Sequence, residues 1–405
     1  MSGRDVVITG IGIITPLGDR LDTVFERACD GDVPFAAPTV FDPSALPGHV
    51  VAEVTAFAPE KYVRTGNIRP LDRTGRLALV GAELALADSG WDADARERQP
   101  IGLIVGTMFC SVRTIAEFDR RGLQAGPQFV SPMDFSNTVL NAAAGQVAIW
   151  HKLTGVNSTV AAGTASGVQA LGYAAELIRM GRADALVAGG AEEICFESAL
   201  GFARAGRLAR PEGERPGCGV PFDTRRSGSV LGEGAAFALL EAEQIARARG
   251  ARIVGRLRGW ANGYDPDALA GGPRTGDGLA HTIDRALADA DVPDVGLVSA
   301  SASGSPVLDI AEASAIAAAI GENTPVMATR SVTGESLGAA GALQAIFALQ
   351  TLRSRRVPGI AGLEAVDPAV RINVDAAARP LDAERALVTA TSHEGHTVAL
   401  VLSLN

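Results

Sequence analysis

Residues 158–193 read STVAAGTASGVQALGYAAELIRMGRADALVAGGAEE, and they contain the clearest signal of the fold class. A β-branched run leads into a turn of small residues, GTASG at 163–167, and a segment with helical spacing follows the turn. The apolar run ALVAGG then indicates a second buried strand. A strand, a helix and another strand in this order indicate an α/β fold. A turn at a helix N-terminus can also present a nucleophile, because the free N–H groups and the helix dipole favour negative charge there.

The turn contains no cysteine, and Thr164 stands in the position of the nucleophile. A thiol at a helix N-terminus attacks as the thiolate, because its pKa falls there, whereas a threonine hydroxyl needs an adjacent base. The alternative is that Thr164 caps the helix predicted at residues 167–181. The motif alone favours the capping interpretation.

The alternation of strands and helices continues through the chain, and its order repeats after residue 250. We therefore predict two duplicated halves, 1–250 and 251–405, that form one compact body. The helix predicted at 337–353 is apolar on nearly all sides, so we expect it to lie between two sheets. The polar, proline-containing segment 111–137 is longer than an ordinary connection. Further strands are predicted at 5–14, 101–108, 157–162, 252–261 and 295–303, and further helices at 72–90, 141–155, 278–291 and 309–321.

The composition of the 405-residue chain limits the possible partners. A content of 47% hydrophobic and 20% charged residues is typical of a globular protein. The formal net charge of -10 argues against a nucleic-acid partner. Cys29, Cys110, Cys195 and Cys218 form no CxxC pair, so we expect free thiols in a reducing compartment. The apolar run at 5–14 is short and broken by glycine, which argues against a signal peptide or membrane span and predicts a cytoplasmic protein.

Four blocks of the sequence resemble the β-ketoacyl synthases of the thiolase superfamily. Residues 158–193 are similar to the segment in which a strand leads to the catalytic cysteine, and VPFDTRRSGSVLGEGAAFALLE at 220–241 resembles the motif PFDxxRxGxxxGEGA. SASGSPVLDIAEASAI at 301–316 resembles HGTGTxxxDxxE, and TRSVTGESLGAAGALQAI at 329–346 resembles KSxxGHxxGAAG. The resemblance extends from Asp5 to Leu404. It implies a thiolase-like α/β fold, with duplicated βαβαβαββ halves in a five-layer αβαβα arrangement.

The departures from this family pattern concern its chemistry. The resemblance implies a catalytic cysteine and two histidines, whose positions are held here by Thr164, Ser301 and Glu335. The family lysine is Arg330, and the gate segment near the C-terminus carries His393. Loss of all three catalytic residues predicts that condensation does not occur in this chain.

Chain-length factors, the β subunits of type II polyketide synthases, combine this fold with such losses. The resemblance to them implies a heterodimer with a ketosynthase α subunit, an acyl carrier protein received mainly by that partner, and no cofactor. The segments GSPVLDIAE and TGESLG fit this branch, although many members have glutamine at the position of Thr164, which leaves decarboxylation by this chain open. The tunnel that limits chain length would be lined by Ser111, Thr114 and Phe118. Ser111 has an equal alternative as a helix cap, and strand 157–162 is expected at the subunit interface.

Two other functions remain open on the sequence alone. Thr164 and His393 would be the catalytic pair of a homodimeric thiolase-fold acyltransferase or thioester hydrolase. A purely structural paralogue is the third interpretation. Arg69, Arg73 and Arg76 fall near the surface where the family docks the carrier protein, but a solvated helix face is the preferred interpretation.

Two short motifs are set aside. HEGH at 393–396 lacks the HExxH spacing and a third ligand, so we predict no metal site. TGIGIIT at 9–15 lacks the third glycine of a dinucleotide-binding turn, so we predict no such cofactor.

Overall fold

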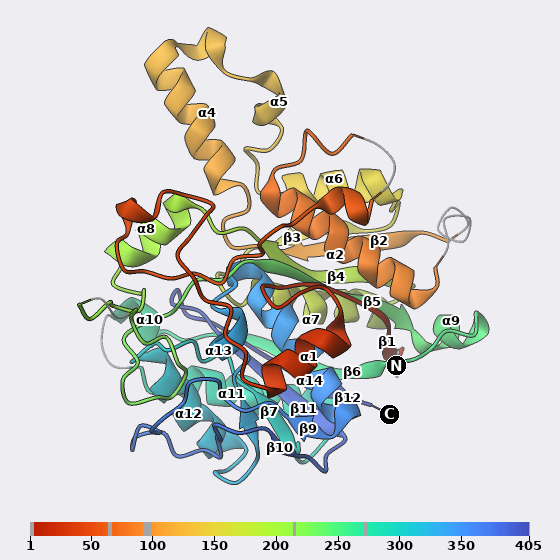
Figure 1. The fold of residues 1–405 in the computed structure, drawn as a ribbon. Coiled ribbons are helices and arrows are strands. Elements are labelled where there is room, and N and C mark those ends of the chain that lie inside the picture. Colours follow the sequence, from red (N-terminus) through yellow and green to blue (C-terminus); the bar gives the residue numbers. More distant parts are fainter. Residues whose placement is uncertain (1–3, 64–66, 92–98, 214–215, 271–273, 405) are drawn as a thin grey trace.

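A computed structural model describes residues 4–63, 67–91, 99–213, 216–270 and 274–404, and it contains one ten-stranded mixed sheet (Figure 1). The strand order is β3-β2-β4-β5-β1-β6-β12-β11-β7-β8. A separate two-stranded sheet joins β9 and β10. The strands are β1 Val6–Ile14, β2 Ile101–Gly106, β3 Asn157–Val160, β4 Ala185–Glu192, β5 Gly234–Ala242, β6 Gly255–Tyr264, β7 Leu297–Ser299, β8 Val326–Met327, β9 Arg356–Val357, β10 Arg379–Pro380, β11 Arg385–Thr391 and β12 His396–Ser403.

The sheet consists of two halves with the same topology. In the first half, β2 pairs parallel with β3 and β4, and β5 pairs antiparallel with β4 and β1. In the second half, β7, β8, β11, β12 and β6 repeat these pairings. The halves join where β1 pairs antiparallel with β6, as between Val6 and Leu257. The predicted thiolase-like fold is thereby confirmed. The division at residue 250 stays a prediction, because the sheet is continuous across the two halves.

Helices form three further layers around the two half-sheets. Helices α7 and α14 pack against each other between the half-sheets, α2 and α6 cover the first, and α11 and α12 cover the second. The five-layer arrangement follows from these contacts. The helices are α1 Leu21–Cys29, α2 Arg73–Ser89, α4 Val112–Ala125, α5 Pro132–Phe135, α6 Ala142–His151, α7 Ser166–Arg179, α8 Phe196–Arg204, α9 Glu243–Ala248, α10 Asp267–Ala270, α11 Asp277–Ala290, α12 Leu308–Ala319, α13 Arg330–Thr333 and α14 Ala340–Ser354, with 3-10 turns η1 Pro43–Ala45, η2 Pro59–Lys61, η3 Pro127–Phe129 and η4 Leu337–Ala339.

Helix α14 lies at the centre of the core. Every residue from Ala340 to Leu352 is buried, as its apolar pattern predicted. The close approach to α7 depends on glycine: a Cβ added at Gly341 would lie 2.8 Å from the backbone nitrogen of Val168. Small residues at this contact therefore allow two helices to fit between the half-sheets.

Segment 111–137 differs from its prediction as a long polar connection. It forms α4, η3 and α5, which together project from the body as an arm (Figure 1). None of the α4 residues is buried, and Leu123 exposes 88% of its surface. Phe135, in α5, exposes 61%. The family resemblance had placed a helix after Ser111, and α4 occupies that position. Its projection from the body was not expected, because periodicity does not record whether an apolar face packs within the chain or stays exposed.

Two further expectations concern the cysteines and the membrane. All four cysteines are free in the structure, with Cys218 half-buried and the others buried. Within the described residues, no helix is both long enough and apolar enough to cross a bilayer.

Candidate functional site

Thr164 lies in the turn between β3 and α7, after Gly163, whose φ of 59° is in the left-handed region. The Thr164 side chain is nearly fully buried, and its Oγ1 donates a hydrogen bond to the carbonyl oxygen of Thr391 at 3.1 Å. The N-cap of α7 is Ala165, which has no side-chain cap. The interpretation of Thr164 as a helix cap is therefore wrong. Its hydroxyl bonds to the second half of the chain because the turn faces β11 rather than the first turn of α7.

Ser301 lies after β7, and its hydrogen bonds fix it to a buried carboxylate. Its backbone N–H and its Oγ donate to Glu312 Oε1 at 2.8 and 2.7 Å, and Thr389 Oγ1 donates to the same oxygen at 2.7 Å. Ser301 Oγ also accepts a hydrogen bond from the Thr391 backbone N–H at 3.1 Å. Burial raises the pKa of Glu312, and these donors oppose the rise. The Ser301 hydroxyl is thus engaged in hydrogen bonds within the chain, and the residue has no ring nitrogen that could contact a substrate.

Glu335 forms a buried ion pair with Arg330, and each residue exposes only 3% of its surface. Glu335 Oε1 also accepts from the Leu337 N–H at 3.1 Å, and Arg330 Nη2 donates to Gln344 Oε1 at 3.2 Å. Burial raises the pKa of Glu335 to about 7, although the Arg330 charge opposes this rise. The positions of the family lysine and second histidine have therefore become a salt bridge.

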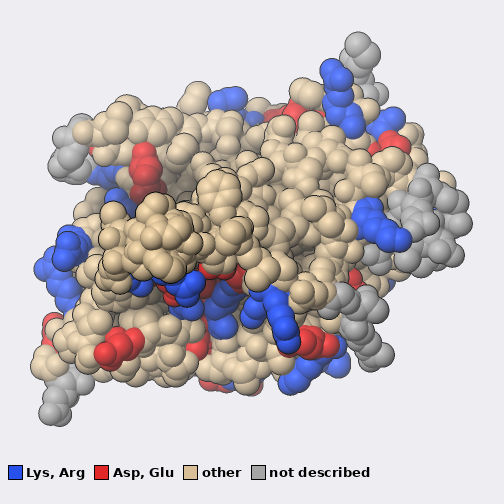
Figure 2. All heavy atoms as spheres, turned by 90° about the horizontal axis from the view of Figure 1, so that it is seen from above, with Lys and Arg blue, Asp and Glu red and all other residues tan. Residues whose placement is uncertain are grey.

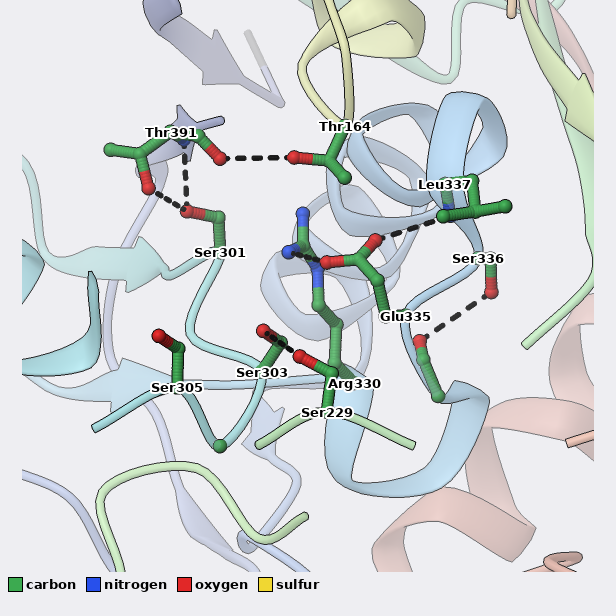
Figure 3. A network of polar contacts seen from close by, with 12 residues as sticks. Thr164, Ser229, Ser301, Ser303, Ser305, Arg330, Glu335, Ser336, Leu337 and Thr391 are labelled. Atoms are coloured by element: carbon green, nitrogen blue, oxygen red, sulfur yellow. Dashed lines mark hydrogen bonds and ion pairs between the residues drawn. The ribbon is translucent and has the colours of Figure 1, made fainter. Parts of the chain in front are cut away.

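These positions belong to one polar network that crosses the two halves (Figure 3). Thr164 reaches Thr391, which is bonded to Ser301 and through it to Glu312. Gln344, on α14, links Arg330 to the Thr389 carbonyl oxygen at 3.2 Å. The structure therefore brings together the three positions predicted from the resemblance. They provide hydroxyl, carboxyl and guanidinium groups, but no thiol and no imidazole.

An arginine-rich cleft of about 780 Å³ opens beside this network. His393 lines it, and burial, reinforced by the charge of Arg207, lowers the pKa of His393 to about 4. The imidazole is therefore neutral at pH 7. Within the described residues, Thr164 and His393 share no hydrogen bond, and Thr164 does not line the cleft. The cleft arginines are Arg207, Arg210, Arg226 and Arg274.

The predicted tunnel residues lie along α4, where it leaves the body. Ser111 is buried at the N-cap position of α4, but its hydroxyl makes no capping hydrogen bond and lies 3.4 Å from Cys110 Sγ. Thr114 and Phe118 are half-buried, and the Phe118 ring packs 5.9 Å from that of Phe135 in the arm. Their role in a tunnel stays a prediction.

Sequence reasoning missed two adjacent buried glutamates at the end of β4. Glu192 accepts hydrogen bonds from the backbone N–H groups of Met108, Phe109 and Gly338, and burial raises its pKa to about 7. Neither carboxyl oxygen of Glu193 has a hydrogen-bond partner among the described residues, and burial raises its pKa to about 8. Two charged residues directly after an apolar strand were the signal that could have found them.

Arg69, Arg73 and Arg76 were interpreted as a solvated helix face, and for Arg73 this interpretation is wrong. Its Nε donates to the buried Glu233 at 2.8 Å, and its Nη2 donates to the Val54 carbonyl oxygen at 2.9 Å. Arg76 is half-buried, and only Arg69 is exposed. Within the described ranges, no group of three histidine, cysteine or acidic side chains could hold a metal ion.

Comparisons with known proteins agree with this fold. The family described as the β-ketoacyl synthase N-terminal domain matches residues 3–246, and its C-terminal domain matches 254–364. The 3-oxoacyl-[acyl-carrier-protein] synthase 2 of Rhizobium meliloti is 31% identical, with 98% of each chain covered. Among solved structures, a β-ketoacyl synthase from Burkholderia phymatum is 29% identical, with 99% and 100% covered and a TM-score of 0.92. The ishigamide ketosynthase/chain length factor is 27% identical, with full coverage of both chains and a TM-score of 0.91. The chain thus belongs to the β-ketoacyl synthase family.

Proposed function

We propose that this chain is a chain-length factor: a non-catalytic subunit that pairs with a ketosynthase α subunit and sets polyketide length during malonyl-derived elongation on an acyl carrier protein. One observation carries the proposal. The three catalytic positions hold Thr164, Ser301 and Glu335, whose polar groups are bonded within the chain. The likeness to the ishigamide ketosynthase/chain length factor supports it.

The arrangement of Thr164 argues against turnover in this chain. A hydroxyl must lose its proton to a base before it attacks a thioester. The Thr164 hydroxyl donates its hydrogen bond to the backbone carbonyl oxygen of Thr391, which cannot act as that base. A thioester hydrolase is the second candidate, because His393 is neutral at pH 7, as a general base must be. Its lowered pKa makes it a weak base, and within the described residues it shares no hydrogen bond with Thr164.

The arm supplies the surface on which the partner would bind. Exposed apolar side chains on one projecting element are unusual on a monomer and typical of an interface. Strand β3 also lies at the edge of the sheet, with β2 as its one neighbour, so it can pair with a strand of another chain. The face that carries the arm is largely uncharged at its centre (Figure 2). The exposed apolar residues include Leu123, Phe129, Met133, Phe135, Val139 and Ile149.

In the complex, the first turns of α4 would form a wall of the product tunnel. A growing chain stops when it meets a bulky side chain, so the size of the residues at 111, 114 and 118 would set its length. The buried Ser111 leaves more room than an aromatic residue would. The carrier protein would dock mainly on the α subunit, which holds the reacting thiol.

The experiment is a pull-down of the chain co-expressed with the ketosynthase encoded beside it, followed by elongation of malonyl units on the carrier protein. A one-to-one complex that elongates, when neither subunit does so alone, is the expected result. Thr164→Ala should leave the activity unchanged, and Phe118→Trp should shorten the product.

Other results would contradict the proposal. A homodimer that cleaves acyl thioesters without a partner, and loses this activity on Thr164→Ala, would establish the hydrolase instead. Unchanged product length in Phe118→Trp, with the complex intact, would favour a structural paralogue without a tunnel role.

A further inference from the structure

The arginine-rich cleft and the buried network lie next to each other without being continuous. Gly228, Ser305 and His393 line the cleft, whereas neither Thr164 nor Ser301 does. Behind Gly228 and Ser305, the Oγ atoms of Ser229 and Ser303 lie 2.8 Å apart in a hydrogen bond. Neither position 164 nor position 301 is therefore part of the cleft wall.

The Arg330–Glu335 ion pair is buried near the cleft, because the Arg330 charge acts on His393, which lines it. Arg330 projects from α13 toward the turn that carries Thr164, and Glu335 lies beside its guanidinium group (Figure 3). Neither residue lines the cleft. The pair thus places two long, buried side chains next to both the Thr164 turn and a residue of the cleft wall.

Both partners are held in place from opposite halves of the molecule. The Glu335 backbone N–H donates to the Val230 carbonyl oxygen at 2.7 Å, and the Gly232 N–H donates to the Glu335 carbonyl oxygen at 2.9 Å. Arg330 is tied to α14 through Gln344. A buried charge that loses its partner remains uncompensated, so replacing one member of the pair costs far more than replacing both. The two residues are expected to act together.

We propose that Arg330 and Glu335 act as one plug, a buried ion pair that closes position 164 off from the cleft and keeps acyl thioesters out of this subunit. The inference rests on the proposed function, because a plug in this subunit would confine elongation to the partner's thiol. The seal itself is a property of this chain, so it is measured without the partner.

The test places a reporter thiol behind the plug. Thr164→Cys is made in the full-length chain, with and without the double replacement Arg330→Ala/Glu335→Ala, and alkylation of the introduced thiol by iodoacetamide is followed by mass spectrometry. Rates are measured as a function of pH, because removing Arg330 changes the thiolate fraction. We expect the thiolate of the opened variant to react at least about tenfold faster, equivalent to about 1.4 kcal/mol in the free energy of access.

The matched control removes a salt bridge away from position 164. Arg249 and Glu241 form an ion pair whose glutamate is fully buried. Arg249→Ala/Glu241→Ala, combined with Thr164→Cys, loosens the fold comparably but should leave the alkylation rate of the reporter thiol within about twofold of the single variant. An equal increase in this control would overturn the proposal, because the gain would then reflect general destabilisation.

Two further outcomes also decide the matter. If the double alanine variant is folded, by circular dichroism, and its reporter thiol still reacts slowly, the pair is not the plug. If that variant does not fold, Arg330→Met/Glu335→Ala, which keeps most of the arginine stem, replaces it under the same criterion. Failure of the pull-down with normal protection of the reporter thiol would contradict the proposed function alone.

Discussion

Helix α14 and the α4–α5 arm both carry apolar side chains, but this chain covers only one of them. In α14, Phe347 is fully buried and lies 6.3 Å from the ring of Phe25. In the arm, Phe135 exposes 61% of its surface and has Phe118 as its ring neighbour. The two half-sheets of the duplicated fold enclose α14, whereas the arm extends beyond both of them (Figure 1).

The difference separates the apolar side chains that stabilise this fold from those that are available for association with another chain. Apolar area stabilises a fold only when it leaves water. The α14 side chains do so within the chain, and the arm side chains would do so in a complex. Substitutions in α14 should therefore affect the unfolding equilibrium, and substitutions in the arm should affect association.

The largest effect is expected at the centre. Phe347→Ala should lower the free energy of unfolding by about 3–5 kcal/mol, because it removes a buried ring and leaves a cavity between the half-sheets. Urea unfolding of the isolated chain measures this loss. The matched control, Phe135→Ala in the arm, should change the stability by less than about 0.5 kcal/mol. Similar losses in both variants would show that the arm is part of the folding core.

The next effect concerns association and should reverse this order. Leu123→Asp places a charge on the exposed apolar side of α4, so the complex with the ketosynthase α subunit should weaken by about 2 kcal/mol or more, without a change in the unfolding of the isolated chain. The dissociation constant is measured by surface plasmon resonance.

Leu269→Asp is the control for that measurement. Leu269 exposes 81% of its surface on α10, which belongs to the second half, so the same substitution there should leave the affinity unchanged. Equal weakening by both variants would show that the arm is not the specific interface.

The smallest effect is expected where the arm leaves the body. Glu193 is 2% exposed, and its carboxyl lies 4.0 Å from Arg113 of α4. Burial, reinforced by the charge of Asp72, raises its pKa to about 8, so the folded state retains a proton that the unfolded state loses near pH 4.5. This stabilisation is complete below the unfolded pKa and is lost as the pH rises toward 8. The other charged groups facing Glu193 are Glu233 and Arg73.

Glu193→Gln should remove this dependence and make the chain about 1 kcal/mol more stable than the wild type at pH 8.5, with little gain at pH 4.5. Chemical unfolding across this range provides the measurement. Glu192→Gln should instead destabilise the chain. The new amide N–H₂ group would face backbone N–H groups whose hydrogen bonds Glu192 now accepts. A destabilised Glu193→Gln variant at pH 8.5 would mean that an ionised Glu193 is needed, for example by Arg113.

The amino-acid sequence was enough to predict the fold and to name the residues at the three family positions. The alternation of apolar runs, its repetition after residue 250 and the four family-like blocks indicated the duplicated α/β architecture, because periodicity records which face of an element is buried. The apolar pattern of 337–353 also indicated a central helix. Thr164, Ser301 and Glu335 were identified without coordinates, because the identity of a side chain at a motif position already decides whether a thiol or imidazole is there.

The partners of these side chains became known only from the folded structure. Thr164 bonds to a carbonyl 227 residues away, Arg73 pairs with Glu233 160 residues away, and the segment 111–137 forms an arm with exposed apolar side chains. Arg330 and Glu335 are close in sequence, yet their pairing depends on a loop anchored to the first half. Residue identity and apolar periodicity can be read locally from the sequence. The partner of a polar group cannot, because it depends on which distant elements fold against that group.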